Sequence, residues 1–86
     1  MEKEILKLVR AYVDDNLDPM DKWYDYEVYV VWYCYILGNR KWLVATTIPD
    51  DMYYEVTYNQ EKGEVYLDAY KKEENKCYYM NVVTKE

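Results

Sequence analysis

Three acids in the second half of the chain, Glu55, Glu64 and Asp68, are the residues best suited to chemistry. Paired carboxylates can bind a divalent cation or act as a general acid and base. Calcium and magnesium also need oxygen ligands that converge from loops, which strand side chains rarely supply, so we expect no metal site. Three alternatives remain: catalysis by Glu55 and Asp68, two carboxylates that are merely solvated, or neutralisation of the pair by Lys41 or Lys71.

The composition excludes most other kinds of active site. The chain has no histidine, which removes the Ser/His triad and most zinc sites. Its two cysteines, Cys34 and Cys77, cannot form a zinc cage, and its two glycines cannot build a glycine-rich phosphate loop. We expect both thiols to be reduced, as is usual inside cells. We therefore predict a protein that is not an enzyme and carries no cofactor.

The three acids fall on two neighbouring predicted strands. If Asn59 pairs with Glu64, the alternation of side chains along a strand puts apolar residues on one face of the pair. The opposite face carries the acids together with tyrosines, and we call it the acid–tyrosine face: Tyr53, Glu55, Glu64, Tyr66, Asp68 and Tyr70. Glu55 lies directly opposite Asp68 in this register, and opposed like charges destabilise a strand pair. The pair therefore needs an explanation, either a functional role or simple solvation of both carboxylates.

One helix and an antiparallel sheet are predicted to position these residues. Apolar residues at i, i+3, i+4 and i+7 predict a helix over residues 2–15, which ends before Pro19. β-branched and aromatic runs bounded by glycine or proline predict strands at 26–37, 41–48, 52–59 and 64–71, with 77–83 as a fifth candidate. The predicted fold class is α+β. It is a single domain over residues 1–86, in which the helix packs on one face of a four- to five-stranded antiparallel meander.

The turns decide which side chains face the helix. We expect a three-residue loop at 49–51 that pairs Ile48 with Met52, and a two-residue turn at 38–39. With these turns, alternate residues of the first strand face the helix: Tyr29, Val31, Tyr33 and Tyr35. The others face away from it and form an outward apolar stripe: Val28, Val30, Trp32, Cys34 and Ile36. One helix can cover only one side of a sheet, so the outward apolar stripe predicts a homodimer interface. Residues 77–83 are the alternative cover.

The protein is acidic and rich in tyrosine. It has 11 Lys and Arg against 17 Asp and Glu, for a net charge of −6. This charge disfavours binding to nucleic acid or to anionic membranes and favours a basic protein partner. Thirteen Tyr and three Trp, with no Phe, supply the side chains that dominate protein interfaces. No stretch is apolar enough to span a membrane, and we expect a cytoplasmic protein.

The acidic run before the first strand and the thiol of Cys34 can each be interpreted in two ways. A second acidic run joins the helix to the first strand: Asp14, Asp15, Asp18, Asp21 and Asp25. It is either a solvated loop or an anionic ridge that imitates a row of phosphates. Cys34 is either a small buried residue at the dimer interface or an exposed thiol, which lacks a histidine to activate it.

Two blocks of sequence resemble a known family. Residues 46–55 read Thr-Thr-Ile-Pro-Asp-Asp-Met-Tyr-Tyr-Glu, and residues 66–72 read Tyr-Leu-Asp-Ala-Tyr-Lys-Lys. They resemble the patterns TTxPDGMYYE and YxDAYKK of uncharacterised small proteins carried by phages and mobile elements of Firmicutes. Asp51 stands where that family has Gly, and Asp tolerates the left-handed conformation expected there. The family has no established activity, but its pattern includes Glu55 and Asp68, so the resemblance implies that the acid–tyrosine face is a contact surface.

Our first hypothesis for function is a non-enzymatic interaction protein. It would be a phage or mobile-element accessory factor that occludes a basic host surface, such as that of a defence nuclease. Acidic steering would speed the encounter, and aromatic side chains would anchor the complex. The second hypothesis is a homo-oligomer that binds a nucleotide-like small molecule, for which only Arg40, Lys41 and Lys71 supply positive charge nearby. A structural protein of unknown role is the third.

Overall fold

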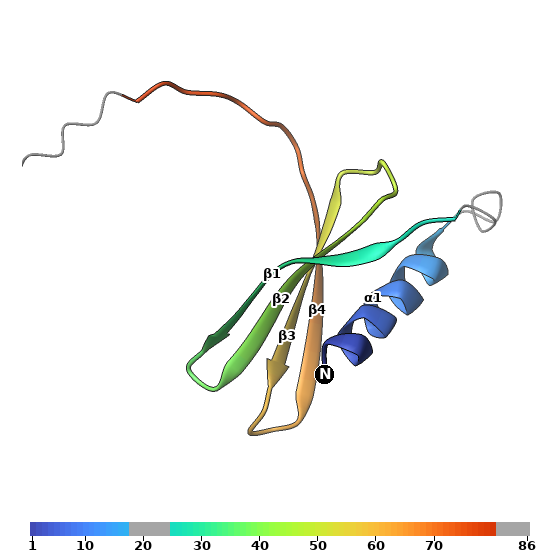
Figure 1. Cartoon of the computed structure of the whole chain (residues 1–86), viewed down its shortest axis with the longest axis vertical. Coiled ribbons are helices and arrows are strands. Elements are labelled where there is room, and N and C mark those ends of the chain that lie inside the picture. The colour runs from blue at the N-terminus through green and yellow to red at the C-terminus, as the bar shows by residue number, and fades with distance from the viewer. Residues whose placement is uncertain (18–24, 81–86) are drawn as a thin grey trace, which may run out of the picture.

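The computed structural model describes residues 1–17 and 25–80, which form one helix and one sheet (Figure 1). In chain order the elements are α1 (Glu2–Asn16), β1 (Val28–Ile36), β2 (Asn39–Thr46), β3 (Met52–Asn59) and β4 (Glu64–Lys71). The strands lie in the order β1-β2-β3-β4, and each neighbouring pair is antiparallel. The predicted α+β class is confirmed, with a four-stranded meander.

The helix packs on one face of the sheet and forms the hydrophobic core with it. Ile5, Val9 and Val13 recur every four residues, which places them on one side of α1, and all three are buried. They pack against alternate side chains of the two central strands: Trp42 and Val44 of β2, and Tyr54 and Val56 of β3. Burial of each such side chain stabilises the fold by about 1.5–3 kcal/mol. This layer fixes which face of the sheet is covered and which is open.

The turn between β1 and β2 differs from the prediction. Leu37 and Gly38 form it, with φ angles of 50° and 80°, and Ile36 pairs with Asn39. Two positive φ angles are typical of the type I′ turn, whose twist matches that of the flanking strands. The predicted turn at 38–39 is therefore wrong by one residue, and the strand partners move by two. A shift of two preserves the faces, so Tyr33 still points inward and its ring lies 5.1 Å from that of Trp42.

A β-bulge at Val31 reverses the faces in the first half of β1. The register shifts between Val30 and Trp32, so Val30 pairs with Val44 and Val28 pairs with Thr46. Val28 and Val30 pack against the core beneath the helix. The prediction that they point outward is wrong, because an alternating pattern does not reveal the extra residue of a bulge.

The bulge leaves the predicted faces intact only in the second half of β1. Trp32 lies opposite Leu43 and Cys34 opposite Lys41, on the face away from the helix. Ile36 follows on the same face by alternation. Tyr29, which was expected to point inward, is opposite Ala45 on the open face.

The loop between β2 and β3 confirms one prediction and corrects another. Asp51 has a φ of 58°, the left-handed conformation expected for this position. The loop is longer than predicted, however, since the last pair is Ala45 with Tyr53 rather than Ile48 with Met52. The carboxylate of Asp50 accepts a hydrogen bond of 3.2 Å from the backbone N–H of Met52, which closes the loop. The register again moves by two, so the predicted faces of β2 and β3 hold.

Residues 72–80, which we call the C-terminal arm, leave the sheet after β4 (Figure 1). The N–H of Lys72 donates a 2.8 Å hydrogen bond to the carbonyl oxygen of Asp51. Beyond it the arm is extended, and every residue from 72 to 80 is exposed. The predicted fifth strand is wrong for residues 77–80, and residues 81–83 lie outside the described residues. No glycine or proline between β4 and Cys77 turns the chain back beside β4.

Candidate functional site

The hairpin of β3 and β4 brings the residues of the acid–tyrosine face together. Asn59 pairs with Glu64 as predicted, so Glu55 lies opposite Asp68 and Tyr53 lies opposite Tyr70. Side chains alternate along a strand, and the neighbours of these residues on β3, Tyr54 and Val56, belong to the core. The acid–tyrosine face therefore points away from the helix.

A hydrogen bond within β4 orients one of the tyrosines. The hydroxyl of Tyr66 donates to Oε1 of Glu64 at 2.6 Å. This bond holds the proton on the phenol, and together with the nearby carboxylate charge it raises the pKa of Tyr66. The rings of Tyr66 and Tyr70 remain 52% and 53% exposed. Both tyrosines are thus presented to solvent, and the hydroxyl of Tyr66 lies beside an acid.

The opposed acids have no cationic partner in the part of the chain that the structure describes. Neither Glu55 nor Asp68 takes part in an ion pair among residues 1–17 and 25–80. Lys71 lies opposite Met52, so alternation places it on the helix-covered face. Lys41 is on the open face but lies opposite Thr57, and Leu43 is the neighbour of Glu55. Neutralisation by Lys41 or Lys71 is therefore not the arrangement found.

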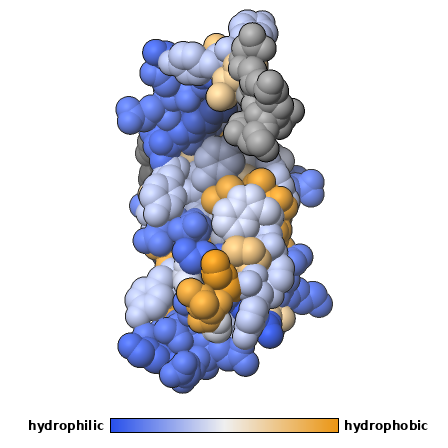
Figure 2. Space-filling view, turned by 90° about the vertical axis from the view of Figure 1, so that its left-hand side faces the viewer, coloured by the Kyte–Doolittle hydropathy of each residue, from blue (hydrophilic) through white to orange (hydrophobic). Residues whose placement is uncertain are grey.

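The apolar part of β1 and the acid–tyrosine face belong to one continuous open face. Trp32, Leu43, Glu55 and Asp68 lie side by side across the four strands. Figure 2 views the side opposite the helix and shows hydrophobic groups near its middle, beside paler and hydrophilic ones. The open face therefore grades from apolar at β1 to acidic at β4. Sequence analysis separated these two parts and did not identify the row that joins them.

A small hollow interrupts the open face near the β2–β3 loop. Its volume is about 140 Å³, and Tyr29, Ala45, Asp51 and Tyr53 are among the residues that line it. Ala45 is buried although no helix covers it, because Tyr29 and Tyr53 stand on either side. The sequence did not predict Tyr29 as a site residue. Its position on the open face follows from the bulge at Val31.

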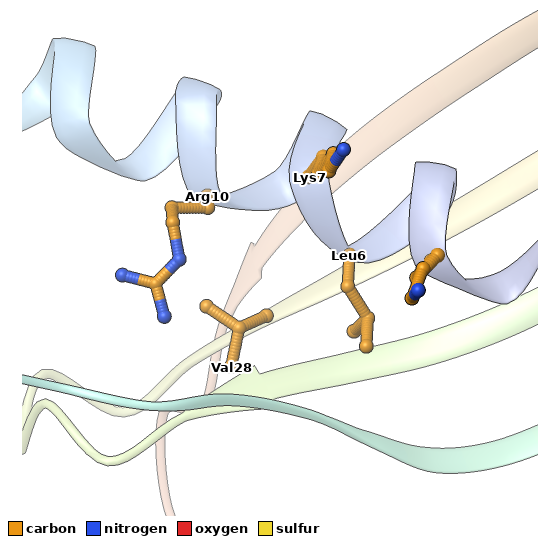
Figure 3. Close-up of a pocket in the computed structure, with 5 residues that line it drawn as sticks. Leu6, Lys7, Arg10 and Val28 are labelled. Atoms are coloured by element: carbon orange, nitrogen blue, oxygen red, sulfur yellow. The ribbon is translucent and has the colours of Figure 1, made fainter.

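A second groove, on the helix side, is lined by cations. Lys3, Lys7 and Arg10 line it with Leu6 and Val28, and its volume is about 340 Å³ (Figure 3). The three basic residues recur at spacings of four and three, which places them along one side of α1. This spacing is visible in the sequence, but the position of β1 beside it is not. The groove is a positive feature on a protein of net charge −6.

Tyr26 ties the start of β1 to the helix. Its hydroxyl donates a hydrogen bond to the carboxylate of Asp14, and the guanidinium of Arg10 lies 4.7 Å above its ring. Burial and the Asp14 carboxylate raise the pKa of Tyr26 to about 12. Asp14 therefore has a structural role although it is exposed, as Asp15 and Asp25 are too. Asp18 and Asp21 of the same acidic run lie outside the described residues.

Metal-binding and thiol chemistry have little support in the described residues. Among residues 1–17 and 25–80, no group of three or more acids, cysteines or histidines is placed to hold a metal ion. Cys34 and Cys77 are free thiols, the first half-buried and the second exposed. In the same residues no helix is long and apolar enough to cross a membrane.

Comparison with known proteins places the chain in a family. The model of a family of unknown function, DUF6275, matches residues 2–80. The chain belongs to the DUF6275 family. The match includes the helix, all four strands and the C-terminal arm. No curated protein and no solved structure matches the chain. The prediction of an uncharacterised family is confirmed, whereas a link between DUF6275 and phages or mobile elements stays a prediction.

Proposed function

We propose that this DUF6275 protein is a non-enzymatic interaction protein that binds a basic protein surface through its acid–tyrosine face. The observation that carries the proposal is the pair of opposed carboxylates, Glu55 and Asp68, which has no cationic partner in the described residues. Opposed like charges on a sheet cost a few tenths of a kcal/mol to about 1 kcal/mol. A lysine or arginine of a partner would remove that cost on binding.

The tyrosines around the pair supply the rest of a protein interface. Tyr66 and Tyr70 are about half exposed on β4, and Tyr53 is half-buried beside them. Tyrosine adds a large contact area and a hydrogen-bonding tip at a small cost in conformational entropy. The apolar residues Trp32 and Leu43 extend the same face toward β1 and can form the drier part of the contact.

The charge of the whole chain supports the same kind of partner. A net charge of −6 attracts basic surfaces and repels nucleic acid and anionic membranes. Attraction of this kind raises the association rate and makes it sensitive to salt. Following the resemblance to phage and mobile-element proteins, we propose further that the partner is a host protein in the cytoplasm, such as a defence nuclease, whose basic surface the protein occludes.

The test is an affinity capture with two variants that carry the same change in net charge. The full-length chain, immobilised at low salt, is exposed to an extract of the host cell, and the bound proteins are identified by mass spectrometry. Glu55→Lys/Asp68→Lys reverses the charge of the opposed pair. The control, Asp15→Lys/Glu61→Lys, changes two exposed acids that lie on the helix and in the β3–β4 loop.

The two variants are expected to differ in the proteins that they capture. The wild type and the control should retain the same basic proteins and release them when the salt concentration is raised. Glu55→Lys/Asp68→Lys should retain none of them. If it retains them as well as the control does, the acid–tyrosine face is not the binding surface.

A further inference from the structure

Two features of the structure lack a partner among residues 1–17 and 25–80: the C-terminal arm and the outer edge of β1. In the arm, Tyr78, Tyr79 and Met80 are 76%, 97% and 81% exposed. Large apolar and aromatic side chains at such exposure are typical of a segment that is buried in a complex. The family match extends to residue 80, so the arm belongs to the unit that defines DUF6275.

The two edges of the sheet are protected to different degrees. β4, at one edge, carries the charged residues Glu64, Asp68 and Lys71. β1, at the other edge, is nine residues long and has none: its sequence is VYVVWYCYI. Natural sheets usually protect an open edge with charges, proline or a covering segment. The bulge at Val31 twists β1 locally but leaves its backbone groups on either side free to pair.

The cationic groove lies beside this same edge. Val28 of β1 forms one wall of it, and Lys3, Lys7 and Arg10 of α1 line the other (Figure 3). Between Lys72 and Lys76 the arm carries two acids, Glu73 and Glu74, of which Glu74 forms an exposed ion pair of 3.7 Å with Lys76. An extended arm placed along β1 would bring these acids next to the basic side chains of the groove.

We propose that the C-terminal arm of one copy adds as an extended strand to the open edge of β1 in a second copy, with both arms exchanged in a homodimer. Backbone hydrogen bonds to β1 provide the affinity, as in other cases of strand addition. The apolar side chains of Cys77–Met80 cover the edge of β1, and Glu73 and Glu74 lie against the groove. An arm that returned to its own sheet would first meet β4, because β1 is three strand spacings away, or about 14 Å.

This dimer goes beyond the proposed function and does not depend on it. Strand addition uses the edge of β1 and the groove on the helix side. The acid–tyrosine face lies on β3 and β4 and points away from the helix, so it stays free in the dimer. A failure of one proposal therefore leaves the other testable.

The first test measures the mass of the full-length protein in solution by size-exclusion chromatography with light scattering. Tyr78→Pro/Tyr79→Pro removes two consecutive backbone donors from the arm and disfavours strand pairing. Tyr78→Val/Tyr79→Val is the matched control, since valine keeps both donors and favours strands. Tyr78 and Tyr79 are exposed and lie six or more residues beyond the Lys72 hydrogen bond, so neither variant should lower the stability of the folded monomer.

The expected result is a dimer for the wild type and the valine variant, and a monomer for the proline variant. A monomeric wild type would overturn the proposal. A proline variant that remains dimeric would also overturn it, because the contact would then lie elsewhere, for example between the open faces.

The second test locates the arm on its partner. Cys34→Ser leaves only the thiol of the arm, and Cys77→Ser leaves only the thiol of β1. In a mixture of the two variants, any bond that a short bismaleimide forms between Cys34 and Cys77 must join two copies. We expect this cross-link, and expect the proline substitutions to abolish it. Its absence from a dimeric mixture would show that the arm does not lie along β1.

Discussion

The same four strands form both faces of the sheet, but the side chains of one face are buried and many of those on the other are exposed. On the covered face, Trp42 is 2% exposed and packs against the helix, whereas Trp32, one strand away on the open face, is 41% exposed. The covered face holds side chains that folding buries. The open face holds an opposed pair of acids and several exposed tyrosines, which folding does not require. Stability therefore depends on the covered face, and the proposed function assigns binding to the open face.

The largest expected effect is a difference between two tryptophans. Trp42→Ala should lower the free energy of unfolding by about 3–5 kcal/mol, because it empties a fully packed site. Trp32→Ala should lower it by less than about 1.5 kcal/mol, because the side chain is partly solvated. Urea unfolding followed by circular dichroism measures both. Equal losses would mean that the open face contributes to the core of the folded monomer.

The next effect concerns Tyr26, which belongs to the covered side. Tyr26→Phe removes the hydrogen bond to Asp14 and should cost about 1–2 kcal/mol of stability. The folded-state pKa of Tyr26, about 12, lies above its ordinary value of about 10, so the stabilising contribution of this group is fully present below about pH 10. Stability should then fall as the pH rises through 12.

The control for the loss of stability is Tyr66→Phe, which removes an exposed hydroxyl from the open face. Thermal unfolding of the wild type should show a steeper loss between pH 10 and 12 than unfolding of Tyr26→Phe. Tyr66→Phe should leave the melting temperature near neutral pH unchanged, since its ring and hydroxyl are exposed. The same pH profile in the wild type and in Tyr26→Phe would contradict the role assigned to Tyr26.

A smaller effect of opposite sign is expected on the open face. Asp68→Asn removes the repulsion with Glu55 and should stabilise the protein by a few tenths of a kcal/mol to about 1 kcal/mol. The same change should weaken capture of basic proteins. A residue that lowers stability while supporting binding is typical of a functional surface. A variant that is both less stable and fully competent to bind would refute this division.

The smallest effect is expected at Asp51, in the loop between the two faces. Its φ of 58° suits glycine, and its carbonyl contact with Lys72 does not need a side chain. The relief of strain and the greater freedom of the unfolded chain nearly cancel, so Asp51→Gly should change the unfolding free energy by less than about 0.5 kcal/mol. A clear drop in the melting temperature would contradict the loop conformation.

The amino-acid sequence predicted the fold class, the bounds of the helix to within one residue and the pairing of β3 with β4. These parts were predictable because they depend on local periodicity and on one short loop, from Asn59 to Glu64. Side chains alternate with a period of two, so errors of two residues at the other turns left the faces unchanged. The residues of the acid–tyrosine face therefore share one face of the β3–β4 hairpin, as the sequence predicts.

The bulge at Val31 and the C-terminal arm could not be predicted in the same way. A bulge inserts one residue into an unbroken run of β-branched and aromatic side chains, and nothing in that run marks its position. It moved Val28 and Val30 into the core and Tyr29 onto the open face. The arm has the composition of a strand, but within the described chain no neighbouring strand pairs with residues 77–80.

The most direct test of the division between the faces is a side-chain footprint of the complex with a captured basic protein. Hydroxyl-radical oxidation of Tyr53, Tyr66 and Tyr70 should fall on binding, while that of Leu6 and Val28 at the helix groove should not change. Protection at the groove with undiminished oxidation of the three tyrosines would show that the partner binds the helix side.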